Sequence, residues 1–209
     1  MDFTKALNWR YATKQFDKTK KISDQDLQTL KDSLRLAPSS FGLQPWKFFV
    51  IEDQALRAQL QPAAFNQSQV SESSHFIVIT AKKNMTEADV KTFVESISQT
   101  RGVPVEALKG YQDMMMQSVN GRSAEELWQW NARQAYIPLG FLMATAAYMG
   151  IDTCPMEGFN GPQVDEILRL EAMGLRSVVC VAVGYRASED KTAAYKKVRL
   201  AEKDVIIVK

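Results

Sequence analysis

An uncharged run from Ala135 to Ile151 is the feature that most constrains how this chain of 209 residues can fold. Its 17 residues reach only the short limit for a membrane-spanning helix, and Pro138, Gly140 and Gly150 interrupt it. The flanking charges show no strong asymmetry. We therefore expect no membrane span. A helix that is apolar all round lies either at the centre of a domain or in an oligomer interface, and the sequence leaves both alternatives open.

The composition is that of one globular domain. Hydrophobic residues make up 45% of the chain and charged residues 24%, and the length suits one substantial core, so residues 1–209 are expected to form a single domain. A net charge of +2 gives no field that would attract nucleic acid or an anionic membrane. Cys154 and Cys180 match no metal-ligand spacing, so we expect reduced core cysteines and no metal. Reduced cysteines and an N-terminus without a secretory signal predict a cytoplasmic protein.

Capping residues predict where the main helices begin. Ser23, Thr86 and Ser123 are each followed three positions later by an acidic residue, which is typical of a capping box. These signals predict a helix over about 24–35, a second from residue 87 and a long third from residue 124 to about 149. A further helix is expected to begin at Pro104, and Pro138 should kink or break the long one.

Four short apolar segments predict strands. They are Lys47–Ile51, Phe76–Ala81, Ser177–Val183 and, more weakly, Val205–Val208. The second and third are almost continuously apolar and β-branched, so they should lie centrally in a sheet that is covered on both faces. The chain is thus predicted to be a mixed α+β fold in which helices outweigh strands.

Several common enzyme motifs are absent from the sequence. There is no G-x-x-x-x-G-K-[ST], no G-x-G-x-x-G after a strand and no G-x-S-x-G elbow. The only histidine, His75, directly precedes a predicted strand, where a structural role is the commoner alternative. Nucleophilic catalysis through histidine and multi-histidine metal sites are therefore poorly supported.

The segment from Ala37 to Trp46 is a candidate ligand-binding loop. Pro38 and Pro45 fix φ and remove backbone donors, while Gly42 permits a conformation closed to other residues. A rigid loop that displays hydroxyls, an amide and an indole suits the rim of a ligand site. The alternative is a helix end and a turn whose tryptophan covers the core.

Two basic segments and one short loop are further candidates. Residues 10–14 (RYATK) and 196–199 (KKVR) are either solvated faces or convergent donors for a phosphate group. Fixed cations also suit a cofactor that gains negative charge on reduction. Residues 155–159 (PMEGF) form either a binding loop around Glu157 or a surface turn whose Phe159 plugs the core.

Taken together, these segments resemble the FMN-dependent nitroreductase family, most closely its oxygen-insensitive NAD(P)H nitroreductase and dihydropteridine reductase branch. The resemblance covers essentially the whole chain, with four motifs in the same order and at similar spacing. The motifs are Arg10-x-x-x-Lys14, Pro38-Ser39-Ser40-x-x-x-Gln44-Pro45-Trp46, Pro155-x-Glu157-Gly158-Phe159 and Lys197-x-Arg199.

The resemblance implies an α+β fold with a central, mainly antiparallel sheet flanked by helices, in an intertwined homodimer. Two FMN sites would lie at the subunit interface, and the uncharged helix would make much of the dimer contact. The implied cofactor-binding residues are Arg10, Tyr11, Ala12, Lys14, Pro38, Ser39, Ser40, Asn66, Pro155, Met156, Glu157, Gly158, Lys197 and Arg199.

The resemblance also implies how this set divides around the cofactor. Phosphate is held by residues that match Arg10, Lys197 and Arg199. Lys14 lies near the pyrimidine edge of the flavin, and Asn66 contacts the ring edge. The backbone of residues 157–158 addresses flavin N5, the reactive atom, so no protein residue is expected to be catalytic. Residues 38–40 come from the partner subunit.

Three positions depart from the family pattern. Ala12 stands where close relatives often carry Ser, and Gln69 where some have a second Lys near the flavin, so charge stabilisation rests more on Lys14. Phe41 is bulkier than the residue common at its position and should narrow the pocket or stack on an aromatic substrate. We expect the acceptor to contact Phe41, Lys14 and Asn66.

The implied activity is that of an NAD(P)H oxidoreductase. FMN takes a hydride from NADH or NADPH and passes electrons to a small-molecule acceptor, such as a nitroaromatic, a quinone or a related flat electrophile. One alternative is a protein of the same fold that stores, senses or fragments FMN without turnover. Another is a helical interaction module that binds no flavin.

Overall fold

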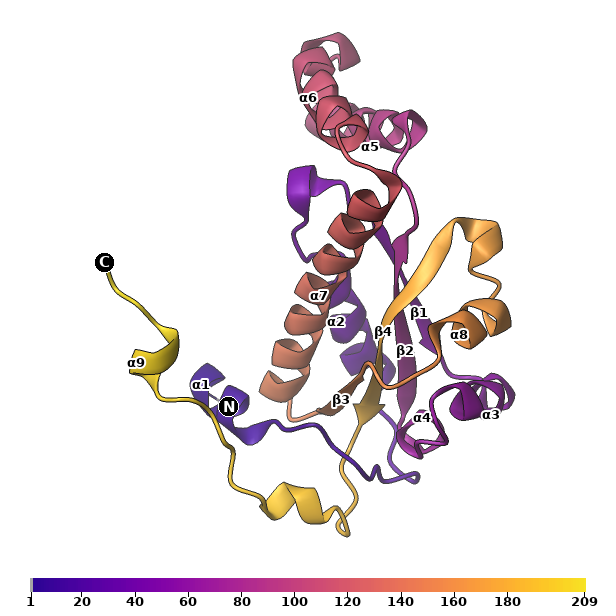
Figure 1. The fold of residues 1–209 in the computed structure, drawn as a ribbon. Coiled ribbons are helices and arrows are strands. Elements are labelled where there is room, and N and C mark those ends of the chain that lie inside the picture. The colour runs from indigo at the N-terminus through magenta and orange to yellow at the C-terminus, as the bar shows by residue number, and fades with distance from the viewer. Residues whose placement is uncertain (1) are drawn as a thin grey trace.

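The computed structural model describes residues 2–209 and is built around a four-stranded antiparallel sheet (Figure 1). The strand order is β1-β2-β4-β3, and every neighbouring pair is antiparallel. This arrangement confirms the predicted α+β fold and the central position of the second and third predicted strands. The strands are β1 (Trp46–Ile51), β2 (His75–Lys82), β3 (Asp152–Met156) and β4 (Leu175–Gly184).

Helices cover both faces of this sheet. The α-helices are α1 (Phe3–Trp9), α2 (Asp24–Arg35), α3 (Gln54–Ala63), α4 (Gln69–Glu72), α5 (Glu87–Arg101), α6 (Lys109–Asn120), α7 (Ala124–Tyr148), α8 (Gly161–Ile167) and α9 (Glu202–Val205). Short 3₁₀ turns are η1 (Ser40–Gly42), η2 (Val105–Leu108), η3 (Glu171–Met173) and η4 (Lys191–Ala194).

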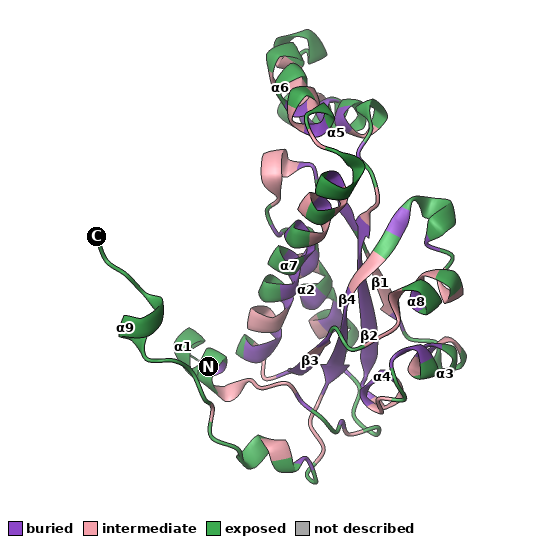
Figure 2. Cartoon of the chain, viewed as in Figure 1, coloured by how far each residue is buried: buried purple, intermediate pink, exposed green. Residues whose placement is uncertain are grey.

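Alternation along β2 explains why the sheet needs cover on both sides. Ile77 and Ile79 pack into one core cluster with α2 and α7, whereas Phe76 and Val78 pack into another with α3, α4 and α8. Successive side chains of a strand point to opposite faces, so a continuously apolar strand must be buried twice. Figure 2 shows the resulting buried interior between the two helical layers.

The predicted helix starts are confirmed by their caps. The side chains of Ser23, Thr86 and Ser123 each accept a hydrogen bond from the backbone N–H three residues later. The helix expected to begin at Pro104 opens as the turn η2 before α6 begins. Pro138 does not break α7, which continues for ten residues beyond it to Tyr148. Its burial in the core offsets the lost backbone hydrogen bond.

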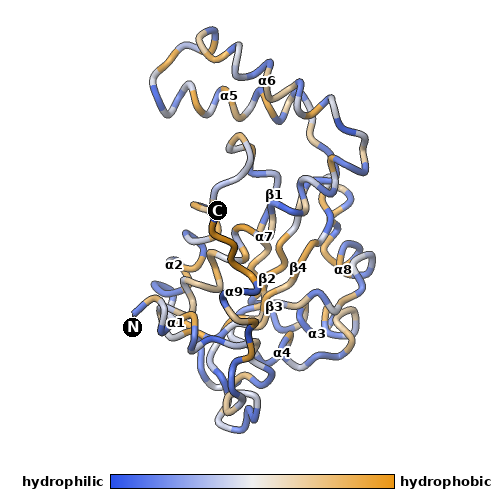
Figure 3. The backbone as a smooth tube through the Cα atoms, turned by 60° about the vertical axis from the view of Figure 1, so that its left-hand side comes forward, coloured by the Kyte–Doolittle hydropathy of each residue, from blue (hydrophilic) through white to orange (hydrophobic). Residues whose placement is uncertain are grey.

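Two sequence-based interpretations were wrong. Pro155 and Met156, which were predicted to lie in the 155–159 loop or turn, instead end the edge strand β3, and an edge position tolerates the missing donor of Pro155. The weakly predicted strand Val205–Val208 is instead the end of α9 followed by extended chain. Ile206, Ile207 and Val208 are exposed, because the described chain offers them no neighbouring strand. Figure 3 shows this apolar C-terminal end.

Two parts of the chain project from the layered body (Figure 1). The α5–α6 hairpin extends beyond the end of α7, around a small core cluster of its own. The C-terminal segment leaves β4 and runs past α1. Within residues 2–209, no helix combines the length and apolarity needed to cross a bilayer. Both cysteines are free and buried, as expected.

Candidate functional site

Three cations from the two ends of the chain meet at one cavity. Arg10 follows α1, while Lys197 and Arg199 belong to the C-terminal segment, and all three line a cavity of about 430 Å³ together with Tyr11 and Ala12. The Lys197 ammonium donates a hydrogen bond to the carbonyl of Arg10. The fold therefore brings the first and the last candidate motifs together.

The charges in this cavity are uncompensated. Burial, reinforced by the charge of Arg199, lowers the pKa of Arg10. Burial also lowers the pKa of Lys197, and the charges of Arg10 and Arg199 add to that effect. No ion pair within residues 2–209 involves any of the three, and Arg10 Nε is buried without a hydrogen-bond partner. Such a cluster of cations is suited to a group that carries two negative charges and accepts several hydrogen bonds, such as phosphate.

Asp190 holds the segment that follows Arg10. Its carboxylate accepts hydrogen bonds from the Tyr11 hydroxyl and the Lys14 N–H, both at 2.9 Å, and also caps η4. Desolvation opposes ionisation, but hydrogen bonds from Thr192, Lys14 and Tyr11 lower the pKa of Asp190 to about 2. A carboxylate fixed in this way ties residues 11–14 to the C-terminal segment that carries the other two cations.

Arg186 also holds the segment that follows α1. Its guanidinium pairs with the buried Asp152 carboxylate, with Nη2 at 2.6 Å from Oδ1. It also lies over the rings of Trp9 and Tyr11, at 4.2 Å and 4.6 Å from their centroids. The backbone between α1 and Lys14 is thus held by a buried ion pair and by cation–π contacts.

Residues 12–14 lie beside strand β3. Ala12 forms a parallel bridge with Thr153, and the exposed Lys14 places its ammonium 4.0 Å from Cys154 Sγ. Burial raises the pKa of the Cys154 thiol, while Lys14 and a hydrogen bond from the buried Gln69 oppose that rise. Lys14 is therefore a cation beside the buried, uncharged side chains of Cys154 and Gln69, and its backbone N–H is held by the Asp190 carboxylate.

The Asn66 loop adjoins the end of β3. Phe65 and Asn66 both adopt left-handed φ values, 54° and 57°, and the Asn66 side chain is exposed. Gln67 Nε2 donates to the carbonyl of Gly158 at 2.8 Å, and the Asn160 N–H donates to Ala63 O at 2.7 Å. Asn66 thus lies on a loop fixed to the segment that contains Glu157 and Gly158.

The Pro38–Trp46 loop is held elsewhere. The Ser40 N–H donates to Gln134 Oε1 of α7 at 2.6 Å, whereas the Tyr136 hydroxyl of the same helix donates to Glu157 Oε1 at 2.6 Å. Positions two apart on a helix are rotated by about 200° about its axis, so their side chains point in nearly opposite directions. Residues 38–41 and residues 157–158 therefore lie on opposite sides of α7, and one chain does not bring them together.

Burial and the bond to Glu157 raise the pKa of Tyr136 to about 12, so its hydroxyl remains a donor at neutral pH. The Tyr136 ring also lines an apolar cavity of about 690 Å³ on α7, which helix α1 borders with Phe3. This cavity adjoins Ile137 and Phe141, which are large apolar residues that remain exposed in the single chain. The uncharged face of α7 is therefore contiguous with the loop that contains Glu157.

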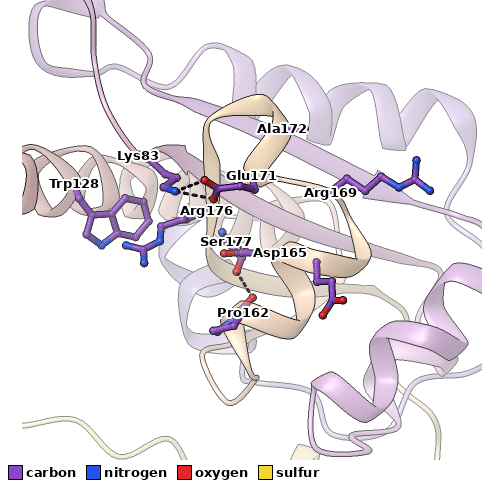
Figure 4. A pocket seen from close by; sticks show the side chains of 11 residues that line it. Lys83, Trp128, Pro162, Asp165, Arg169, Glu171, Ala172, Arg176 and Ser177 are labelled. Carbon is purple, nitrogen blue, oxygen red and sulfur yellow. Dashed lines mark hydrogen bonds and ion pairs between the residues drawn. The ribbon is translucent and has the colours of Figure 1, made fainter.

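A larger cavity, of about 970 Å³, lies between α8, η3 and the start of β4 (Figure 4). Most of its charges are partnered or balanced: Lys83 pairs with Glu171, and the Arg176 guanidinium lies 5.2 Å from the Trp128 ring centroid. Glu166 and Arg169, which take part in no ion pair among the described residues, are opposite in sign. Asp165 accepts a hydrogen bond from the Ser177 N–H. The smaller cavity, with its unpaired cations, is the stronger candidate for an anionic ligand.

Comparison with known proteins places the chain in a family. The model of the nitroreductase family matches residues 7–185 of the chain. The chain belongs to the nitroreductase family. A Staphylococcus aureus (strain USA300) protein provisionally named as an NAD(P)H nitroreductase is 40% identical over 211 residues, covering 96% of this chain and 92% of that relative. A Staphylococcus epidermidis protein of the same provisional name is 38% identical, with 96% and 94% coverage.

Solved structures place this nitroreductase family member in the same fold. A nitroreductase-type protein from Exiguobacterium sibiricum, crystallised in complex with FMN, superposes with a TM-score of 0.86 at 26% identity and covers 100% of this chain and 98% of that one. A Bacillus subtilis structure named for the same activity has a TM-score of 0.88 at 23% identity, with coverage of 100% and 99%. At 23% identity, the likeness to the Bacillus subtilis structure concerns the fold alone.

Sequence reasoning missed several residues that shape this site. Asp190, Gln67 and Tyr136 contact segments far from them in sequence, and none belongs to a motif with a chemical signature. A capping pattern could have marked Asp190, since Thr192 follows it and donates to its carboxylate. Nothing in the local sequence indicates the contacts of the other two.

Proposed function

We propose that this chain is an NAD(P)H-dependent flavin oxidoreductase that binds FMN and reduces nitroaromatic, quinone or related flat electrophilic acceptors. The observation that carries the proposal is the buried Arg10 Nε without a partner, in a cavity it shares with Lys197 and Arg199. The donor set fits the FMN phosphate, because a dianion would satisfy the orphaned donor and relieve the repulsion among the cations. The FMN-bound family member of the same fold and the named relatives support this assignment.

The remaining candidate residues take roles around the isoalloxazine ring. Lys14 would stabilise negative charge at the pyrimidine edge, and Asn66 would hydrogen-bond the ring edge. Residues 155–158 would place their backbone against N5, with Tyr136 holding the Glu157 side chain. FMN, when bound, supplies the hydride chemistry between NAD(P)H and the acceptor. The protein positions both substrates and tunes the charge, and it needs no nucleophile of its own.

The proposed cofactor site requires a second copy of the chain. Residues 38–41 lie across α7 from Glu157, so they could join this set only from a partner subunit. The exposed apolar residues of α7 and of the C-terminal end give such a partner a surface to bury. We therefore propose an intertwined homodimer with two shared sites.

The dimer is expected to persist at micromolar protein concentration. Its interface would bury Ile137 and Phe141, whose exposure on a lone chain is unfavourable. Sedimentation velocity should give about twice the 23.6 kDa of one chain. Ile137→Glu should shift the protein toward monomer and lower its FMN content, whereas Leu36→Glu, at a more exposed apolar position at the end of α2, should not. A stable, FMN-loaded monomer would reject the shared site.

The reaction is tested by the visible spectrum of the purified protein under anaerobic conditions. The protein should carry the absorption of oxidised flavin, and NADH or NADPH should bleach it. Adding a nitroaromatic or a quinone should then restore the oxidised spectrum. Flavin that no reduced nicotinamide can bleach would favour FMN storage, sensing or fragmentation on the same fold. A colourless protein that FMN cannot reconstitute would contradict both.

A further inference from the structure

The loop that carries Ser39 and Ser40 is bent by a run of left-handed backbone. Phe41, Gly42 and Gln44 have φ values of 55°, 79° and 47°. A bulky residue with positive φ is an outlier that persists only when surrounding contacts impose it. The conformation of this loop therefore needs a support outside the loop.

The α5–α6 hairpin supplies that support. The Tyr111 hydroxyl of α6 donates to the carbonyl of Phe41 at 2.8 Å. The two rings also meet, with centroids 6.3 Å apart and planes inclined by 59°. From α5, the Phe93 ring lies so close beneath Gly42 that a Cβ at that position would come within 2.8 Å of it.

Phe41 is also part of the core of the α5–α6 hairpin. Its side chain is half-buried and packs on the cluster that contains Met115, Val119 and Leu127. The adjacent Ser39 Oγ accepts from the Gln44 N–H at 2.9 Å, and the Ser40 N–H is fixed to α7. The loop thus has two anchors, one on α7 and one on the hairpin.

We propose that Tyr111 is a positioning residue that fixes the Pro38–Phe41 loop for cofactor binding and couples it to the α5–α6 hairpin. The inference rests on the proposed function, in which residues 38–40 contact FMN across the subunit interface. It makes the hairpin and the loop one unit, so a displacement of the hairpin moves Ser39 and Ser40. The half-buried Phe41 ring is then a fixed wall of the acceptor site whose position Tyr111 sets.

Tyr111→Phe tests this role, because it removes one hydroxyl and keeps the ring. The dissociation constant of FMN should rise about 3- to 10-fold, the loss expected for one neutral hydrogen bond. The visible circular dichroism of the bound flavin should change, and KM for the acceptor should rise more than kcat falls. Gly110→Ala is the matched control, since an added methyl group on α6 meets nothing within 4 Å. It should leave FMN affinity and spectrum unchanged.

If Tyr111→Phe bound FMN as tightly as the wild type and showed the same flavin dichroism, the inference would be overturned. The proposed function would still stand. A variant with lowered thermal stability but unchanged FMN binding would do the same, because it would show a structural role alone. Failure of the wild-type protein to bind FMN would instead overturn the proposed function and the inference together.

Discussion

Arg199→Gln should weaken FMN binding by roughly 10- to 100-fold, because it removes one charge-assisted contact to phosphate worth about 1.5–3 kcal/mol. The same change should not lower the stability of the cofactor-free protein. The charge of Arg199 lowers the pKa of both Arg10 and Lys197. A cation whose pKa is lowered by folding favours the unfolded state while it is charged, so removing its neighbour relieves a cost at neutral pH.

The two opposite effects make this variant diagnostic. Equilibrium dialysis gives the FMN dissociation constant, and urea denaturation of the cofactor-free protein gives its stability. Lys203→Gln is the matched control, since it removes the same charge from an exposed position four residues further along the C-terminal segment. Unchanged FMN affinity in Arg199→Gln would reject the phosphate assignment. A loss of affinity that Lys203→Gln shares would show only a long-range effect of net charge.

Local signals explain why most of the fold could be predicted. The capping residues act through bonds to neighbours three positions away, so Ser23, Thr86 and Ser123 reveal their helices without tertiary information. The strands β2 and β4 are apolar on both faces, a pattern that only a covered central position produces. By contrast, β3 is short and contains Pro155, and its pairing depends on β4 more than twenty residues away in the chain.

The candidate site was less accessible to sequence reasoning. The basic segments that contain positions 10, 197 and 199 stand out in the sequence, and the family resemblance implied that they share one phosphate. Their mutual repulsion, however, is a property of the folded cavity. The contacts from Asp190 and Tyr111 join residues that are far apart in sequence, 176 to 179 residues in the first case and 70 in the second. Long-range hydrogen bonds leave no periodic trace in a single sequence.

Arg57 is a further residue without a sequence signal, and it holds the helix that leads to the Asn66 loop. Its side chain is fully buried in α3, and no carboxylate within the described chain pairs with it at close range. Instead, its guanidinium donates to the carbonyls of Ile51, Ser73 and Ser74 at 2.6–2.8 Å. Burial lowers its pKa to about 10, which still leaves it charged at neutral pH.

Arg57→Met should therefore destabilise the protein by roughly 3–5 kcal/mol, since each buried carbonyl left without a donor costs about 1–3 kcal/mol. Urea denaturation should show a lower midpoint at an unchanged slope. Arg57→Lys should recover only part of the loss, because one ammonium cannot reproduce the planar donor geometry. Arg101→Met, the same change at an exposed position, should stay within about 0.5 kcal/mol of wild type. If Arg57→Met matched that control, the carbonyl contacts would contribute nothing net, and α3 would be held by its apolar face alone.

Those contacts join the end of β1 to the residues before β2, so their loss should also loosen the Asn66 loop at the far end of α3.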